Sequence, residues 1–322
     1  MTMRILAATA LAGMISACAT VPGATGGDCD RACLAETLDT YLDAVQAGDP
    51  SLAPIFSAYR HTENSVVTPL GTGIWTHFNG IGGLDRRYYD PVTGNAVFFG
   101  AVDDGAEELA LISLRIHVLG GEVSEAEWHI AHRTDPGIEG EPATTLFDVD
   151  AQIADPPPDR IVPVAERASR AELLAVANSY FDGITNASRE IALTNPACYR
   201  RENGFPVTGR PLAEERAWDG TDGMSDCKSG QGQFDVMNVT ARRFPVVDEV
   251  NQVVIGSAVF IRTPGHPKWR NHFSDVMIMD NGRLSGLFAT MFYVPPTRPV
   301  PNWPESAYDG NYEVGVRGMS AE

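Results

Sequence analysis

A histidine and a carboxylate stand two residues apart in a segment with strand-like character. His61 and Glu63 lie within residues 60–67, where β-branched and polar residues alternate as in a β-strand. Side chains two positions apart on a strand project from the same face, so this pair could exchange a proton or simply form an ion pair. His129 and His132 are three positions apart on another predicted strand, face opposite sides and make a poor metal-binding pair.

The segment that contains this pair occurs twice in the chain. Residues 41–64 recur without a gap 139 residues later as residues 180–203. Gly-Glu-Val-Ser at 121–124 is similar to Gly-Arg-Leu-Ser at 282–285, which lies 161 residues later. The second unit therefore carries 22 additional residues, which we place in the loop-like stretch 204–232. The chain is predicted to be a tandem duplication of a domain-sized unit of about 130 residues.

Hydrophobic spacing predicts helices followed by strands in each unit. Apolar residues at helical spacing predict helices at 34–47 and 170–185, and a short helical piece is predicted at 52–56. The predicted strands are 60–67, 97–102, 109–119 and 123–132, then 199–203, 234–243, 253–262, 273–279 and 283–293. This order predicts an α+β fold of two tandem cone-shaped domains, each with N-terminal helices packed on a curved antiparallel sheet. The predicted domains are 29–150 and 167–296, separated by a Pro-rich linker at 151–166 and followed by a tail at 297–322.

The first 17 residues have the pattern of an export signal. Arg4 supplies the positive end, a short apolar run follows, and Ile-Ser-Ala-Cys at 15–18 resembles the bacterial lipobox. That resemblance implies lipidation of Cys18, a tether at 18–28, and a position on the periplasmic side of the outer membrane, with membrane contact only through the lipid. The alternative is an ordinary cleaved signal in which Cys18 has no role.

Four cysteines are left in the exported chain, an even number that predicts disulfides. Cys198 precedes a predicted strand and Cys227 lies in the additional stretch, so we pair them as a staple. Cys29 and Cys33 would close a very short ring, which is geometrically demanding. Free or metal-bound thiols are the alternative, although this spacing does not match a four-cysteine zinc site.

Composition and missing motifs exclude several classes of function. The formal charge of −18 without a basic cluster argues against nucleic acid as a partner, and no later apolar run is long enough for a membrane helix. The chain has no Gly-x-Ser-x-Gly elbow, no P-loop and no dinucleotide-binding glycine pattern. We therefore expect no cofactor and no bound metal.

Several segments resemble known protein families. Residues 41–49, Tyr-Leu-Asp-Ala-Val-Gln-Ala-Gly-Asp, look like the first helix of the nuclear-transport-factor-2 fold shared by SnoaL-like cyclases and ketosteroid isomerases. Cys-Asp-Arg-Ala-Cys-Leu at 29–34, Gly-Thr-Gly-Ile-Trp at 71–75 and Arg-Arg-Phe-Pro-Val-Val-Asp-Glu at 242–249 resemble an uncharacterised family of tandem SnoaL-like proteins. Such domains commonly pair through their sheets, so an intramolecular pseudo-dimer or a homodimer is expected.

The resemblance to ketosteroid isomerases implies site residues. It gives Tyr41, and more weakly Tyr180, the role of hydrogen-bond donor to a developing enolate, and gives a carboxylate near Glu63 or Glu202 the role of base. A second acid is expected on a later strand, where the first unit has Leu114 and its neighbours and the second unit has Ser274 and Asp275, so neither unit matches the full isomerase set. The candidate catalytic residues are Glu63, Tyr41, His61 and Asn64 in the first unit, and Glu202, Tyr180, Asn203 and Asp275 in the second; Trp75, Trp128 and His129 are expected to line the first pocket.

Two functions agree with these observations. The first is a cofactor-free isomerase, lyase or dehydratase that acts on a small apolar substrate by proton transfer, with the first unit preferred. The second is a non-catalytic envelope lipoprotein that binds a small ligand or a partner protein. The structural alternative for the site residues is a tyrosine that fastens helix to sheet and a carboxylate paired with Arg60 or Arg201.

Overall fold

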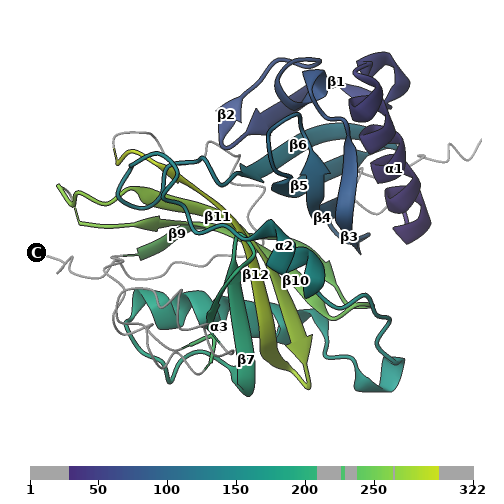
Figure 1. The fold of residues 1–322 in the computed structure, drawn as a ribbon. Coiled ribbons are helices and arrows are strands. Elements are labelled where there is room, and N and C mark those ends of the chain that lie inside the picture. The colour runs from purple at the N-terminus through teal and green to yellow at the C-terminus, as the bar shows by residue number, and fades with distance from the viewer. Residues whose placement is uncertain (1–28, 209–225, 229–237, 264, 297–322) are drawn as a thin grey trace, which may run out of the picture.

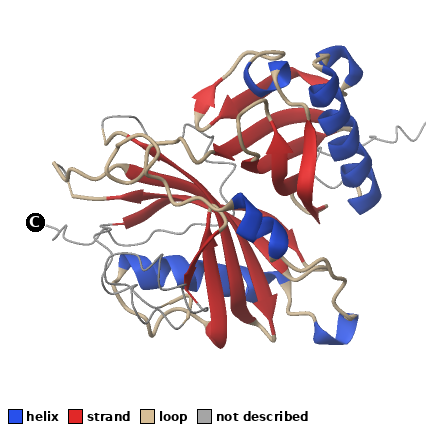
Figure 2. Ribbon diagram, in the orientation of Figure 1, coloured by secondary structure: helices blue, strands red, loops and turns tan. Residues whose placement is uncertain are grey.

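The computed structural model describes residues 29–208, 226–228, 238–263 and 265–296. Over these residues the chain forms two halves, each with one long helix beside a six-stranded sheet (Figure 1; Figure 2). The sheets have the same strand order, β2-β1-β6-β5-β4-β3 in the first half and β8-β7-β12-β11-β10-β9 in the second. Pairing is antiparallel except between β1 and β6 and between β7 and β12, which run parallel.

The first half starts with helix α1 (Arg31–Ala47). The Asp30 side chain accepts a hydrogen bond from the Cys33 backbone N–H, and Gly48 ends the helix at φ 65°, a left-handed conformation that glycine adopts without strain. The remaining elements are the 3₁₀ turns η2 (Pro50–Leu52) and η3 (Gly73–Thr76) and strands β1 (Ile55–Glu63), β2 (Val66–Val67), β3 (Gly80–Asp90), β4 (Asn95–Asp103), β5 (Ala110–Leu119) and β6 (Glu122–Ala131).

The second half repeats this plan after a connecting segment. Helix α3 (Arg170–Thr185) starts at a capping box in which Ser169 and Glu172 satisfy each other's backbone N–H groups. The connecting segment carries α2 (Val149–Ala154) and the turn η4 (Val164–Glu166), and the strands are β7 (Thr194–Glu202), β8 (Phe205–Thr208), β9 (Asn238–Asp248), β10 (Val253–Ile261), β11 (Arg270–Asp280) and β12 (Arg283–Val294).

The predicted α+β fold of two cone-shaped domains is wrong. The described residues form a mostly β structure with two mixed sheets and three α-helices, and a single long helix precedes each sheet. The helical piece expected at 52–56 is the three-residue turn η2, after which Ile55 already pairs with Val123 of β6. The sheets are also not purely antiparallel, because β1 and β7 join their sheets in parallel with the last strand of each half.

The two sheets pack against each other, so each is covered on both faces. One face of each sheet holds a core cluster with its own helix, and the other face contributes to a shared cluster between the halves. This explains why β4, β10 and β11 are buried almost without alternation, as strands covered on both sides are. The shared cluster includes Leu84, Val97, Phe99, Leu111, Val246, Ile255, Val276 and Phe288.

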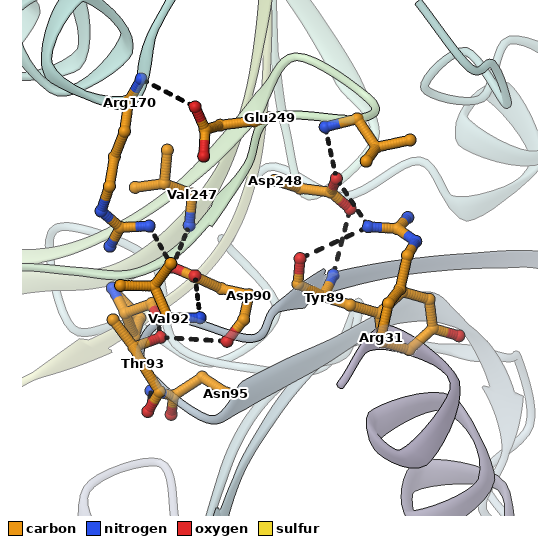
Figure 3. Close-up of polar contacts among 12 residues, drawn as sticks. Arg31, Tyr89, Asp90, Val92, Thr93, Asn95, Arg170, Val247, Asp248 and Glu249 are labelled. Carbon is orange, nitrogen blue, oxygen red and sulfur yellow. Dashed lines mark hydrogen bonds and ion pairs between the residues drawn. The ribbon is translucent and has the colours of Figure 1, made fainter. Parts of the chain in front are cut away.

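A reciprocal set of ion pairs joins the halves, and we call it the clasp (Figure 3). Arg31, at the start of α1, contacts Asp248 of the second half at 2.8 Å, and Arg170, at the start of α3, contacts Asp90 of the first half at 2.8 Å. Each aspartate also accepts a backbone N–H from the opposite half, Asp248 from Tyr89 and Asp90 from Val247. Equivalent residues thus make equivalent contacts across an approximate two-fold relation between the halves.

Two disulfides join Cys29 to Cys33 and Cys198 to Cys227. The second bridge fastens β7 to the described part of the additional stretch 204–232. The predicted signal, Cys18, the tether, the tail at 297–322 and most of that stretch lie outside the described residues. No helix among the described residues is long and apolar enough to cross a membrane.

Candidate functional site

Helix α1 and strand β1 bring two tyrosines together in the first half. Tyr41 is fully buried, and its hydroxyl lies 2.7 Å from the hydroxyl of Tyr59. The ring of Trp75 packs edge-on against Tyr41, with centroids 5.4 Å apart, and Trp128 lies against the same tyrosine. These polar groups therefore meet inside an otherwise apolar core, where hydrogen bonds are stronger than in water.

Burial controls the ionisation of this tyrosine pair. Loss of hydration raises the pKa values of Tyr41 and Tyr59 well above the ordinary value, so both hydroxyls keep their protons at neutral pH. The indole N–H groups of Trp75 and Trp128 are close enough to lower the Tyr41 pKa slightly, yet neither has a hydrogen-bond partner among the described residues. The cluster is consequently rich in donors, as a site for an oxygen acceptor would be.

His61 and Glu63 complete the first-half site. His61 is buried, and its Nε2 lies 3.3 Å from the Glu63 Oε1. The Glu63 carboxylate, whose side chain is 19% exposed, also accepts a hydrogen bond from the Ile74 backbone N–H at 2.8 Å. Gly73 at φ 59° lies so close that a Cβ there would collide with this carboxylate. The glutamate thus contacts both the histidine and the turn that carries Trp75.

In the second half the position equivalent to His61 carries a charged residue, Arg200. Arg200 stands where the first half has His61, is buried, and donates to the Tyr180 hydroxyl at 3.0 Å. Its Nε lies 3.2 Å from the Glu202 Oε1, and the Glu202 side chain is 17% exposed. The Cys198–Cys227 bridge occupies the place of Tyr59. The second half therefore has an arginine-centred cluster in place of the tyrosine pair.

Asp275 on β11 belongs to this second cluster. It is 3% exposed, and no described residue forms a hydrogen bond or ion pair with its carboxyl group. Burial, reinforced by the charge of Glu202, raises its pKa well above the ordinary value despite Arg200. Asp275 therefore keeps its proton to a higher pH than an ordinary carboxyl group does.

Asn64 and Asn203 have a structural role. Asn64 lies at φ 45°, and its side chain exchanges two hydrogen bonds with the Ile130 backbone, at 2.8 and 2.9 Å. Asn203, at φ 47°, makes the same pair with the Met291 backbone, at 2.7 and 2.8 Å. Both amides tie the end of a strand to its parallel neighbour, so neither is free to act on a substrate.

His129 does not join Trp75 and Trp128 in the first-half site. Neighbouring residues of a strand face opposite sides, so Trp128 points towards α1 while His129 lies between the halves. There it lines a cavity of about 10 Å³, enough for one water molecule, together with Arg243, His272 and Phe273. Its ring also packs against Phe292, with centroids 5.3 Å apart.

Two residues of these clusters were not among the candidates from the sequence. Tyr59 lies four positions before Glu63, and Arg200 lies two positions before Glu202. The period-two rule that pairs His61 with Glu63 extends to both, so the signal was present. Within the described part of the chain, no group of three or more His, Cys, Asp or Glu side chains could hold a metal ion.

Comparison with known proteins gives little functional information. Residues 166–287, most of the second half, match the family described as Domain of unknown function (DUF8021). A search of curated proteins finds no significant match. Among solved structures, the chain is similar to that titled "Structure of AusH from Aspergillus nidulans", with 14% identity over 41% of this chain and 89% of that one at a TM-score of 0.27. A match at this TM-score carries no conclusion about fold or function.

Proposed function

We propose that the first half is a cofactor-independent enzyme that moves a proton on a small, largely apolar substrate. The observation that carries this proposal is the hydroxyl pair of Tyr41 and Tyr59, 2.7 Å apart in an apolar core and within electrostatic reach of Glu63. Protonated, desolvated hydroxyls are suited to stabilise negative charge that develops on a substrate oxygen. A carboxylate with a partly exposed side chain is suited to take a proton from carbon.

Each residue of the first-half site has its own task in the proposed reaction. Glu63 removes a proton from the carbon next to a substrate carbonyl, and the tyrosine hydroxyls donate hydrogen bonds to the resulting enolate oxygen. Glu63 then returns the proton to the same or a neighbouring carbon, so that the atoms balance. His61, 3.3 Å from Glu63, orients the carboxylate. This assignment follows the resemblance of residues 41–49 to ketosteroid isomerases, in which a tyrosine and a carboxylate have these roles.

Exchange of carbon-bound protons with deuterated water tests this proposal even when the product is unidentified. Small cyclic and aryl ketones would be incubated with the protein, and deuterium uptake followed by mass spectrometry. We expect Glu63→Gln to reduce exchange by about 100-fold or more, because general-base catalysis is typically of that size. Tyr41→Phe should also reduce it, while Glu108→Gln, at an exposed carboxylate that pairs with Arg133, should not. Exchange that is absent from the wild type, or unaffected by Glu63→Gln, would refute the proposal.

A second candidate is a ligand-binding protein without catalysis. The hydrogen bond from the Ile74 backbone N–H to Glu63 favours it, because a carboxylate that fastens a turn has a structural task already. This role predicts saturable quenching of tryptophan fluorescence by an aryl ketone with no deuterium exchange. Replacement of Trp75 by Phe should then reduce the quenching, since Trp75 lies against Tyr41.

We also infer that the chain is an exported lipoprotein, anchored through Cys18. Support comes from the lipobox-like sequence at 15–18 and from two disulfides, which suit an oxidising compartment. Metabolic labelling with a fatty-acid analogue should mark the wild type and not Cys18→Ala. Equal labelling of both, or of neither, would contradict this inference.

A further inference from the structure

One row of residues across the second sheet differs in size from its counterpart in the first. In the second half Glu202 lies opposite Ala289, Ala289 opposite Asp275, and Asp275 opposite Gly256 in successive strands. Residues directly opposite one another project from the same face of a sheet. Two carboxyl groups therefore flank a methyl group, with their backbones about 10 Å apart at the usual strand spacing of about 4.8 Å.

Large side chains fill the same row in the first half. There Glu63 lies opposite Trp128, Trp128 opposite Leu114, and Leu114 opposite Phe98. Trp128 is fully buried and packs against Tyr41, so its indole occupies the space beside the glutamate. The change from tryptophan to Ala289 removes that filling group, and the change from leucine to Asp275 adds an acid. Both changes occur in the row that carries the glutamate.

Arg200 and Tyr180 organise the charges of the second row. Arg200 contacts Glu202 at 3.2 Å and donates to the Tyr180 oxygen at 3.0 Å. A cation that donates into the oxygen of a hydroxyl polarises its O–H bond and makes it a better donor. Asp275 is buried and has no hydrogen-bond partner among the described residues, and burial raises its pKa well above that of an ordinary carboxyl group. A proton acceptor and a proton donor thus lie on either side of Ala289.

We propose that the second half contains its own acid–base site, which eliminates water from a small β-hydroxy carbonyl compound. Glu202 takes the proton from the carbon next to the carbonyl, and Asp275 gives its proton to the leaving hydroxyl. The C–H and C–O bonds break, a C=C bond forms and water departs. A proton then passes from Glu202 to Asp275 through solvent and restores both groups. Tyr180 donates to the carbonyl oxygen during the reaction.

This site is independent of the proton-transfer site proposed for the first half. It uses different residues, and its substrate must present a hydroxyl group to an acid, which the first-half row, with Leu114 in the place of Asp275, does not supply. The elimination therefore does not require Glu63.

The test uses the full chain and a β-hydroxy aryl ketone, whose elimination product is an enone with strong ultraviolet absorption. Glu202→Gln and Asp275→Asn should each lower enone formation by about 100-fold or more, the usual size of acid–base contributions. Ala289→Trp introduces the first-half residue and should block the reaction while both carboxyls remain. Glu108→Gln, at an exposed carboxylate that pairs with Arg133, is the matched control and should leave the rate unchanged. A thermal unfolding scan of each variant checks that it is folded.

A pH profile of the unaltered chain keeps the proposal testable if the variants do not fold. The rate should fall as Asp275 loses its proton, at a pH above the ordinary range of a carboxyl group. The proposal is overturned if the wild type forms no enone, if the Glu202, Asp275 and Ala289 variants retain full activity, or if Glu63→Gln abolishes the reaction. The last result would assign the elimination to the first half.

Discussion

The clasp between the halves leads to a quantitative prediction about Asp248→Ala. The Asp248 side chain is fully buried and accepts hydrogen bonds from Arg31 and from the backbone N–H groups of Tyr89, Val250 and Asn251. Breaking a buried ion pair by removal of one partner costs about 3–5 kcal/mol. The Arg31 side chain is 33% exposed and can regain water once its partner is removed. We therefore expect Asp248→Ala to lower the free energy of unfolding by about 3 kcal/mol, the low end of that range.

Replacement of the arginine should cost less. Arg31→Ala removes one charge-assisted hydrogen bond, worth about 1.5 kcal/mol, and leaves Asp248 with its three backbone donors. A double-mutant cycle of the two changes should therefore give a coupling energy of about 1–2 kcal/mol. Urea unfolding, followed by tryptophan fluorescence, measures each free energy from the transition midpoint and slope.

The pseudo-symmetric pair is the matched control. Arg170 and Asp90 have the same separation of 2.8 Å and similar burial, so their cycle should give a coupling within about 1 kcal/mol of the first. A coupling below about 0.5 kcal/mol in both cycles would refute the reasoning, because the pairs would then orient the halves without stabilising them. A large coupling in one cycle alone would contradict the two-fold equivalence.

Three further predictions concern stability. The hydrogen bond to Asp104 raises the pKa of His132 to about 9. The stabilisation of the fold by protonated His132 is therefore complete below pH 6.5 and is lost as the pH rises through about 9. The urea midpoint should fall over that window in the wild type and not in His132→Gln. Removal of the Cys198–Cys227 bridge, which spans 29 residues, should lower the free energy of unfolding by about 3.5 kcal/mol, measured with both cysteines replaced by alanine. Asn64→Ala should lower the free energy of unfolding by about 3 kcal/mol, because two hydrogen bonds are lost and alanine is strained at a positive φ. Asn64→Gly should recover part of that loss, because glycine adopts a positive φ without strain. Equal losses in both variants would argue against the contribution of backbone strain.

Local patterns in the sequence predicted many of the elements. The helices at 34–47 and 170–185 and the strands that became β4, β5, β6, β10 and β12 have a clear period or clear turns, and the structure has them within a few residues. Strand β3 was missed, because Gly-Ile-Gly-Gly-Leu-Asp-Arg-Arg at 80–87 shows neither alternation nor an apolar run. It is a strand because β4 pairs along it and the other half covers it.

The contacts between halves could not be predicted from local patterns. Arg31 and Asp248 are 217 residues apart, and nothing beside either residue indicates the other. The same applies to Asp275, whose relation to Glu202 depends on both lying opposite Ala289. The predicted pairing of His61 with Glu63 needed only the period of one strand, and the structure places these two side chains together.

The repeated Glu-Asn pair shows how an internal duplication separates architecture from chemistry. The asparagine makes the same two backbone hydrogen bonds in both halves, so its repetition is explained by the fold alone. The glutamate is repeated too, but its neighbours differ, with His61 beside Glu63 and Arg200 beside Glu202. Beside Glu202 the second half also has an acid, Asp275, and a small residue, Ala289, where the first half has Leu114 and Trp128. The differences between the halves, more than their likeness, therefore lie at the positions on which the two proposed sites depend.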